Sequence, residues 1–260
     1  MAMTTITLIL SGVSFLAGFV DSIAGGGGLI MLPALLLAGI PPQNALGTNK
    51  FGSTFGTGAA LVNFVRSKKV IWKIATVGVG FTLTGSFLGT KTILLFSNRA
   101  IGKIIVFLLP FAILGALAPR KERTLNEDLT KWDLYLKVPL ICFSIGFYDG
   151  FFGPGTGSFL IIAFYVWIGL NLVQASATAK VFNFLSNVAA LTVFLIEGKV
   201  LFWLGVPLAI ANIIGNYLGS MLAIKKGSRV VKGFLMVSLT ILFISLIWKY
   251  FVPDGIITSP

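Results

Sequence analysis

Long apolar runs separated by short polar stretches recur along this sequence and restrict what it can fold into. Of its 260 residues, 56% are hydrophobic and only 11% are charged, which is too little polar material to cover a soluble domain of this length. A membrane-spanning helix needs ~20 apolar residues, whereas barrel strands would show short alternating segments. The sequence therefore predicts an all-α membrane protein, a polytopic helical bundle of about 8–10 segments.

One long polar run, at 119–133, divides the apolar segments into two sets. We expect a first transmembrane repeat at 1–118, a polar cytoplasmic linker at 119–133, a second transmembrane repeat at 134–252 and a tail at 253–260. Two segments are short, and they either cross the membrane fully or re-enter it. The segments are 5–23, 29–41, 44–65, 71–96, 100–118, 134–150, 157–170, 174–196, 201–224 and 230–252, the short ones being 29–41 and 157–170.

The two halves repeat each other in sequence. A shift of 130 residues aligns Lys50 with Lys180, and a shift of 128 aligns Asp21 with Asp149, so the second half has two extra residues between its aspartate and its lysine. Each repeat has an odd number of segments, which predicts that the repeats are inverted relative to each other.

Loop charge supports the inversion, because the strongly basic loops fall at non-equivalent positions of the two repeats. Cytoplasmic loops carry an excess of lysine and arginine, which predicts that these loops lie in the cytoplasm and that both termini lie on the outer side of the cytoplasmic membrane. The basic loops are 66–73, 119–133 and 225–232.

Each half carries one aspartate and one lysine inside apolar sequence. Residues 1–65 contain no charged side chains other than Asp21 and Lys50, and residues 138–196 none other than Asp149 and Lys180. Intramembrane charges normally face a partner or a water-filled cavity, so the four residues should converge between the repeats. Two alternatives stay open: the lysines snorkel to the membrane surface, and the aspartates serve either as proton carriers or as helix caps and structural partners.

Glycine clusters follow both aspartates and predict broken helices. A run of four glycines at 25–28 cannot comfortably stay helical, and Gly153, Gly155 and Gly157 interrupt the second half in the same way. A half-helix that begins there would point unpaired N–H groups into a cavity, which favours anions. With the two lysines added, we expect a strongly positive site; close helix packing by the glycines is the alternative.

Polar side chains next to these features complete the predicted substrate site. They lie just before the lysines or on the same helical face, where they would suit the oxygens of an oxyanion. The predicted substrate-binding residues are Gly25, Gly26, Gly27, Gly28, Thr48, Asn49, Lys50, Ser53, Gly153, Gly155, Thr156, Gly157, Thr178, Lys180 and Asn183, and the candidates for proton coupling or structural pairing are Asp21 and Asp149.

Composition argues against other classes of function. With one cysteine and no histidine, the sequence offers no Cys/His metal site, so we expect no metal and no cofactor. The net charge of +12 is concentrated between apolar segments, which indicates cytoplasmic loops and not a nucleic-acid surface. The expected partners are a small anionic substrate and the lipid bilayer, and homo-oligomerisation is left open.

Several motifs resemble the TauE/SafE family of sulfite-exporter-like membrane permeases, in particular its bacterial inner-membrane transporter branch. The resemblance covers essentially the whole chain and implies a polytopic secondary carrier of sulfite, sulfonates or related carboxylates. The second half departs from the first at Ala179, where the first has Asn49. The motifs are 17–29 (AGFVDSIAGGGGL), 33–35 (PAL), 44–50 (NALGTNK), 146–154 (GFYDGFFGP) and 177–180 (ATAK).

The sequence thus predicts a secondary transporter that moves a small anion across the cytoplasmic membrane by alternating access, with the aspartates as candidates for proton coupling. A passive anion channel is the alternative. A membrane-embedded enzyme is a weaker one, because no nucleophile and base stand out, and we expect no enzymatic activity.

Overall fold

The chain folds into helices joined by short turns. The computed structural model describes residues 3–101, 129–227, 230 and 233, and no β-strand occurs among them. This confirms the predicted all-α bundle. The helices are α1 (Met3–Ala24), α2 (Gly27–Leu37), α3 (Pro42–Arg66), α4 (Trp72–Leu94), η1 (Asp133–Lys137), α6 (Val138–Phe151), α7 (Thr156–Ala163), η2 (Phe164–Ile168), α8 (Leu172–Ile196) and α9 (Phe202–Lys226), where η1 and η2 are π-helical turns continuous with α6 and α7.

The helices coincide with the predicted apolar segments to within a few residues wherever the structure describes them. By length and composition, α1, η1–α6, α8 and α9 are able to cross a membrane. Many large apolar side chains are exposed on the outside of the bundle, as lipid contact requires. The predicted segments 100–118 and 230–252, the tail and nearly all of the linker lie outside the described residues.

Helix α3 has 25 residues and is rich in polar and small ones, and one of its faces is buried in the bundle. Its buried face carries Thr48, Asn49, Lys50, Thr54 and Thr57. Polar residues within membrane helices normally face the protein interior. α3 therefore contributes a polar lining on one face, while Phe55, Val62 and Val65 on its other face are exposed.

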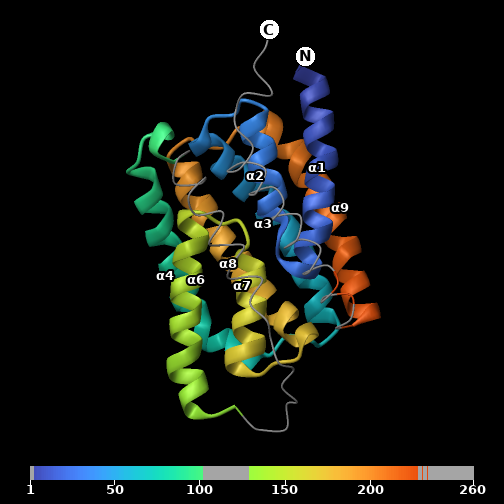
Figure 1. The fold of residues 1–260 in the computed structure, drawn as a ribbon, viewed down its shortest axis with the longest axis vertical. Helices are drawn as coiled ribbons and strands as arrows, with labels where there is room; N and C mark the ends of the chain where they lie inside the picture. Colours follow the sequence, from blue (N-terminus) through green and yellow to red (C-terminus); the bar gives the residue numbers. More distant parts are fainter. Residues whose placement is uncertain (1–2, 102–128, 228–229, 231–232, 234–260) are drawn as a thin grey trace, which may run out of the picture.

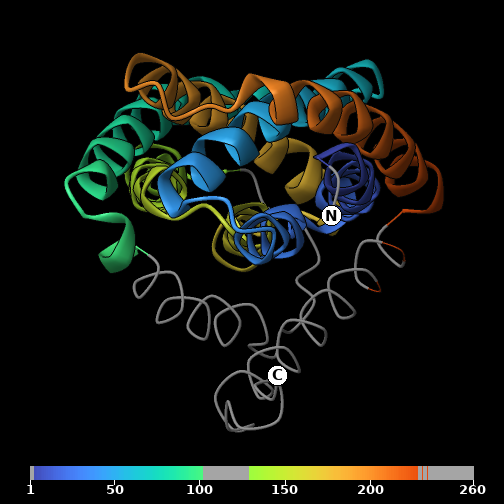
Figure 2. The same cartoon turned by 90° about the horizontal axis from the view of Figure 1, so that it is seen from above.

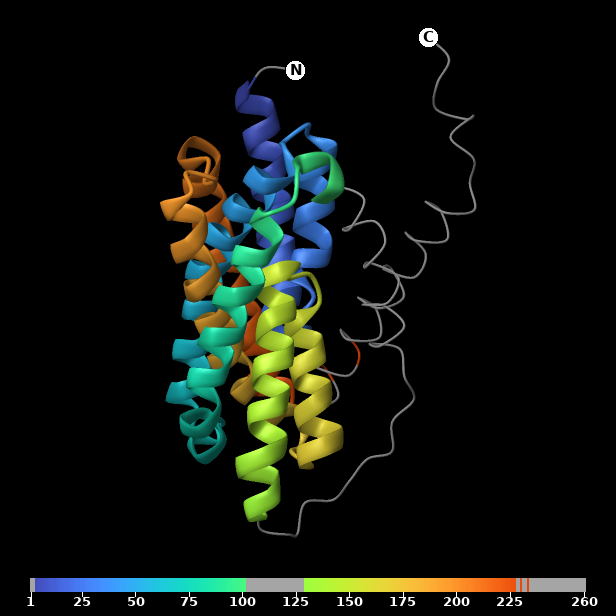
Figure 3. The same cartoon turned by 90° about the vertical axis from the view of Figure 1, so that its left-hand side faces the viewer.

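The two short helices are the returning arms of broken hairpins. α1 runs from one end of the bundle to its middle, and α2 turns back towards the end where α1 began, whereas α6 and α7 do the same from the opposite end (Figures 1 and 3). Gly25 makes the first turn with φ +76°, and Gly153 and Gly155 make the second with φ +92° and +85°. Only glycine adopts these angles without steric cost, so the glycine clusters set where both helices break.

Seen from above, α1, α2, α6 and α7 lie within the curve formed by α3, α4, α8 and α9 (Figure 2). Helix α4 packs against α6, and α9 packs against α1. Both contacts are close because glycines on α4 and α9 face the backbone of the neighbouring helix, so these glycines serve helix packing. The pairs are Gly85 with Phe143 and Phe147, Gly89 with Phe147 and Phe151, Gly215 with Phe15 and Phe19, and Gly219 with Phe19 and Ser22.

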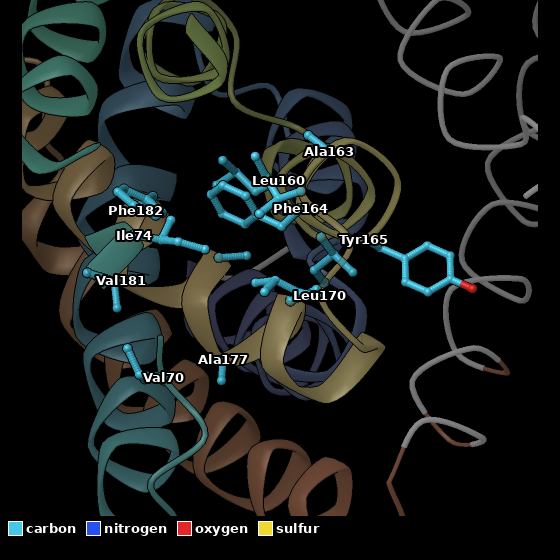
Figure 4. Packing of buried hydrophobic residues seen from close by; sticks show 14 of the residues in the cluster. Val70, Ile74, Leu160, Ala163, Phe164, Tyr165, Leu170, Ala177, Val181 and Phe182 are labelled. Carbon is cyan, nitrogen blue, oxygen red and sulfur yellow. The ribbon is translucent and has the colours of Figure 1, made fainter. Parts of the chain in front are cut away.

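Two apolar clusters surround the short helices. The first gathers α7 and η2 against α8 and the start of α4 (Figure 4), with the Phe164 and Phe182 ring centroids 5.4 Å apart. The second surrounds α2 and includes Leu32, Leu35 and Phe194. The beginnings of α2 and α7, where the polar residues gather, lie between the two clusters.

Candidate functional site

The two helix breaks meet at the centre of the bundle. Ser158, in the first turn of α7, donates its hydroxyl to the Ala24 carbonyl (2.6 Å) and its N–H to the Gly25 carbonyl (3.3 Å). A Cβ on Gly25 would overlap the backbone of Gly157, and a Cβ on Gly157 would overlap Gly25. Glycine at both positions is therefore what lets the two broken hairpins touch.

The first ion pair closes the α1–α2 break. Lys180 on α8 lies 2.6 Å from the Asp21 carboxylate and also donates to the Asp21 carbonyl at 2.6 Å. The other carboxylate oxygen of Asp21 accepts the N–H of Gly27 (3.2 Å), so this side chain caps the start of α2. Both oxygens of Asp21 are thus engaged, and Lys180 is 1% exposed.

The second ion pair lies beside the α6–α7 break and has fewer partners. Lys50 Nζ on α3 lies 2.7 Å from Asp149 Oδ2 and donates to Asn187 Oδ1 on α8 (2.9 Å). Asp149 is 2% exposed, and among the described residues its Oδ2 has the Lys50 ammonium as its polar partner. A buried carboxylate with so few partners depends on that one contact to offset its burial.

A small polar cavity adjoins the second pair. Its volume of about 20 Å³ is enough for one water molecule and too small for an oxyanion such as sulfite. The lining combines side chains of α1, α3, α6 and α8 with the glycine turns. The lining residues are Asp21, Gly25, Gly28, Asn49, Lys50, Ser53, Asp149, Gly153, Gly155, Thr156, Gly157, Asn183 and Asn187.

Several donors at the cavity have no protein partner within the described part of the chain. The side chains of Asn49 and Ser53 form no hydrogen bond there, and the N–H of Gly157 in the first turn of α7 donates to no other described residue. The first N–H groups of a helix lack intrahelical acceptors and carry partial positive charge. Together with Lys50, these groups can bind the oxygens of a small anion.

Residues 10–246 match the protein family described as Sulfite exporter TauE/SafE. The chain belongs to the TauE/SafE family. This confirms the family indicated by the sequence motifs and identifies the bundle as that of a membrane transporter family.

Curated TauE/SafE relatives carry transporter names. The chain is 39% identical over 230 residues to a probable membrane transporter protein of Haemophilus influenzae, covering 86% of this chain and 88% of that one. It is 37% identical over 230 residues to probable membrane transporter protein ORF9 of Sinorhizobium sp (86% and 85%), and 35% identical over 232 residues to probable membrane transporter protein YfcA of Escherichia coli (88% and 85%). No solved structure matches the chain.

Most residues predicted for the site come together in this TauE/SafE chain, and five do not reach the cavity. Three of them lie next to Asp21 at the α1–α2 break and do not line the cavity, namely Lys180, Gly26 and Gly27. Thr48 and Thr178 instead accept the backbone N–H groups of Leu201 and Ile71, at 3.1 Å each, where α9 and α4 begin. The predicted residues that do line the cavity are Gly25, Gly28, Asn49, Lys50, Ser53, Gly153, Gly155, Thr156, Gly157, Asn183, Asp21 and Asp149.

Asn187 lines the cavity although it was not among the predicted binding residues. Its side chain accepts from Lys50 and donates to Asn183 Oδ1 at 3.3 Å. The sequence signal existed, because Lys180, Asn183 and Asn187 are spaced to share a helical face. Spacing alone gives no distance from that face to Lys50 on another helix.

The electrostatics of the TauE/SafE site correct the expectation of a strongly positive centre. Each lysine is paired with an aspartate from the other half of the chain, so the four charges sum to zero. Both lysines are buried, at 3% and 1% exposure, which rules out snorkelling to the membrane surface. Among the described residues, no group of three or more His, Cys, Asp or Glu side chains is placed to bind a metal ion.

Proposed function

We propose that this protein is a secondary transporter that moves a small anion, such as sulfite, a sulfonate or a related carboxylate, across the cytoplasmic membrane by alternating access. The observation that carries the proposal is the buried cavity where Lys50, the α7 N-terminus and unpaired amide and hydroxyl groups converge. Anions bind at helix N-termini because N–H groups and the helix dipole both favour negative charge.

Inverted repeats are part of this proposal. α1 and α6 run in opposite directions (Figures 1 and 3), and so do the broken hairpins that they begin. Transporters of this plan place the substrate between the repeats at the discontinuous helices, and they expose it to each side in turn. With the basic loops in the cytoplasm, both termini would lie outside the cytoplasmic membrane.

The packing around the cavity favours a carrier over a channel. Apolar clusters surround α7 and α2, and a channel would need a continuous polar path past both. The cavity of about 20 Å³ would have to enlarge before it held an oxyanion, as expected when binding is tied to opening on one side. We propose no enzymatic role, because the relatives are named as transporters.

A thermal-shift screen of the purified protein tests the anion site. Sulfite, sulfate, thiosulfate, sulfonates and small carboxylates are compared, because a ligand that binds only the folded state raises Tm. Lys50→Ala should abolish the shift given by the best anion, whereas Lys91→Ala should keep it, because Lys91 is exposed and pairs with Glu197 far from the cavity. A full shift with Lys50→Ala would remove the basis of the proposed site.

Transport itself separates the carrier from its alternatives. In proteoliposomes preloaded with the best anion, a carrier should show saturable counterflow of labelled anion. Unitary currents without counterflow would indicate the channel instead. Chemical turnover in detergent without vectorial movement would indicate the enzyme.

A further inference from the structure

We propose that Asp149 takes up one proton each time a monovalent anion binds, so that anion and proton cross the membrane together. This inference rests on the proposed function and names its coupling ion and coupling residue. It follows from the charge balance of the site, the contacts of the two aspartates and the position of Lys50.

The site is already neutral before an anion enters. Asp21 and Asp149 balance Lys50 and Lys180. A monoanion added to this set would leave one uncompensated negative charge in a buried site within a membrane protein, which is strongly unfavourable. Binding a proton together with the anion restores neutrality.

Asp149 is the aspartate suited to take that proton. Its Oδ2 is buried and has Lys50, at 2.7 Å, as its ion-pair partner, so a proton placed there displaces one contact, and Lys50 keeps its hydrogen bond to Asn187. Asp21 differs, because one of its oxygens accepts the Gly27 N–H and the other is held by Lys180. Protonating Asp21 would weaken the cap of α2 and the link to α8 together.

Lys50 is placed to change partners. It lines the cavity and already donates to Asn187 as well as contacting Asp149. When Asp149 becomes neutral, its attraction for Lys50 falls, and the ammonium group can turn to the anion. Lys180 has no such freedom, since both of its hydrogen bonds are to Asp21.

The other groups near Asp149 do not replace it. On its own helix, the Tyr148 hydroxyl donates to the Pro154 carbonyl (2.6 Å). Lys50 faces Asp149 from α3, and Asp21 reaches the same cavity from α1 with Lys180 of α8 attached. The lysines of α4 are exposed, and α7 carries no charged residue.

Proton and charge balance in each step. On the side to which the site is open, a proton from water binds Asp149 Oδ2, the Lys50–Asp149 ion pair separates, and the anion pairs with Lys50. On the other side the anion leaves, the proton returns to water, and the ion pair forms again. A metal cation would fit less well than a proton at Asp149 Oδ2. Lys50 Nζ lies only 2.7 Å from this oxygen and leaves little room for a metal ion beside it.

Calorimetry with methanesulfonate and benzenesulfonate tests the inference. Both are monoanions throughout the accessible pH range, so any proton taken up belongs to the protein. Titrations in buffers of different protonation enthalpy should give about one proton bound per sulfonate in the wild type, and affinity should fall about tenfold per pH unit where Asp149 is ionised. Asp149→Asn should bind sulfonate without proton uptake and with constant affinity, whereas Glu197→Gln, an exposed control, should behave as the wild type.

The outcomes separate this inference from the proposed function. Sulfonate binding without proton uptake in the wild type, or uptake retained in Asp149→Asn, overturns the coupling role and leaves the anion site standing. If neither sulfonate binds the wild type, this inference fails for sulfonates, and if no anion of the thermal-shift screen binds either, the proposed function fails as well.

A second measurement needs only the wild type, so it holds even if Asp149→Asn does not fold. In proteoliposomes, a pH gradient that is acidic outside should drive sulfonate accumulation inside, and a potassium diffusion potential should not, because the coupled step carries no net charge. Accumulation driven by the potential, or by a sodium gradient at equal pH, overturns the inference.

Discussion

The Asp21–Lys180 and Asp149–Lys50 ion pairs join corresponding helices of the two halves, but their surroundings differ. Asp21 holds Lys180 through two contacts and caps α2 with its free oxygen. In the described part of the chain, the ion-pair partner of Asp149 is Lys50, which is shared with Asn187 and faces the cavity. The same architecture, repeated in the two halves, thus contains one ion pair with a structural role, Asp21–Lys180, and one that is placed to respond to a ligand, Asp149–Lys50.

Two extra residues in the second half give a physical reason for the difference. They lengthen the break after Asp149, and the Gly153 carbonyl there accepts both the N–H (3.2 Å) and the hydroxyl (2.7 Å) of Thr156. One N–H at the start of α7 is thus satisfied within its own turn, without a carboxylate cap. Asp149 has no capping role comparable to that of Asp21 and is left free for other chemistry.

Substitution of the turn glycines should give the largest difference in stability between the two helix breaks. Gly25→Ala combines a positive φ with a Cβ that overlaps the Gly157 backbone, so we expect a loss of more than about 4 kcal/mol and little folded protein. Gly153→Ala has similar strain, but the atoms nearest its Cβ would be the ends of the Lys50 and Asp149 side chains and the Asp149 carbonyl, at 3.3–3.4 Å. It should cost about 1–3 kcal/mol, measured by unfolding in detergent.

Gly39→Ala provides the control for strain alone. Gly39 has φ +81° and nothing within 4 Å of an added Cβ. Equal stability of the Gly25→Ala and Gly39→Ala variants would show that the contact between the two breaks is not what holds the hairpins together.

Removal of each aspartate should have unequal effects on stability. Asp21→Ala leaves Lys180 buried without a counter-ion and removes the cap of α2, which should cost about 3–5 kcal/mol. Asp149→Ala removes no helix cap and leaves Lys50 with Asn187 and the cavity, so we expect a smaller loss, about 3 kcal/mol. Unfolding of both variants under the same conditions measures the difference, and a larger loss for Asp149→Ala would reverse our assignment of the two pairs.

Two threonines away from the cavity should show no such asymmetry. Thr48 and Thr178 accept the N–H groups of Leu201 and Ile71 at the same distance. Thr48→Val and Thr178→Val should therefore each lower stability by about 1 kcal/mol. Clearly unequal losses would mean that the halves already differ at the helix starts and not only at the centre.

Most of the helical architecture was predictable from the sequence, because apolar runs and glycine clusters act locally. The breaks at Gly25 and Gly153 fall where the glycines predicted them. The pairing of charges was not predictable, because Asp21 and Lys180 are 159 residues apart and composition does not tell which aspartate meets which lysine. The neutrality of the site depends on that pairing, so it needed the three-dimensional structure.

Each aspartate pairs with a lysine from the other half of the chain, and this has a consequence for biosynthesis. Asp21 enters the membrane 159 residues before Lys180 is made, an interval on the order of ten seconds at typical rates of synthesis. Throughout that time the nascent chain holds a carboxylate in apolar sequence without its lysine. Until the second half arrives, we expect this segment to stay near water or its carboxyl group to be neutralised by a proton.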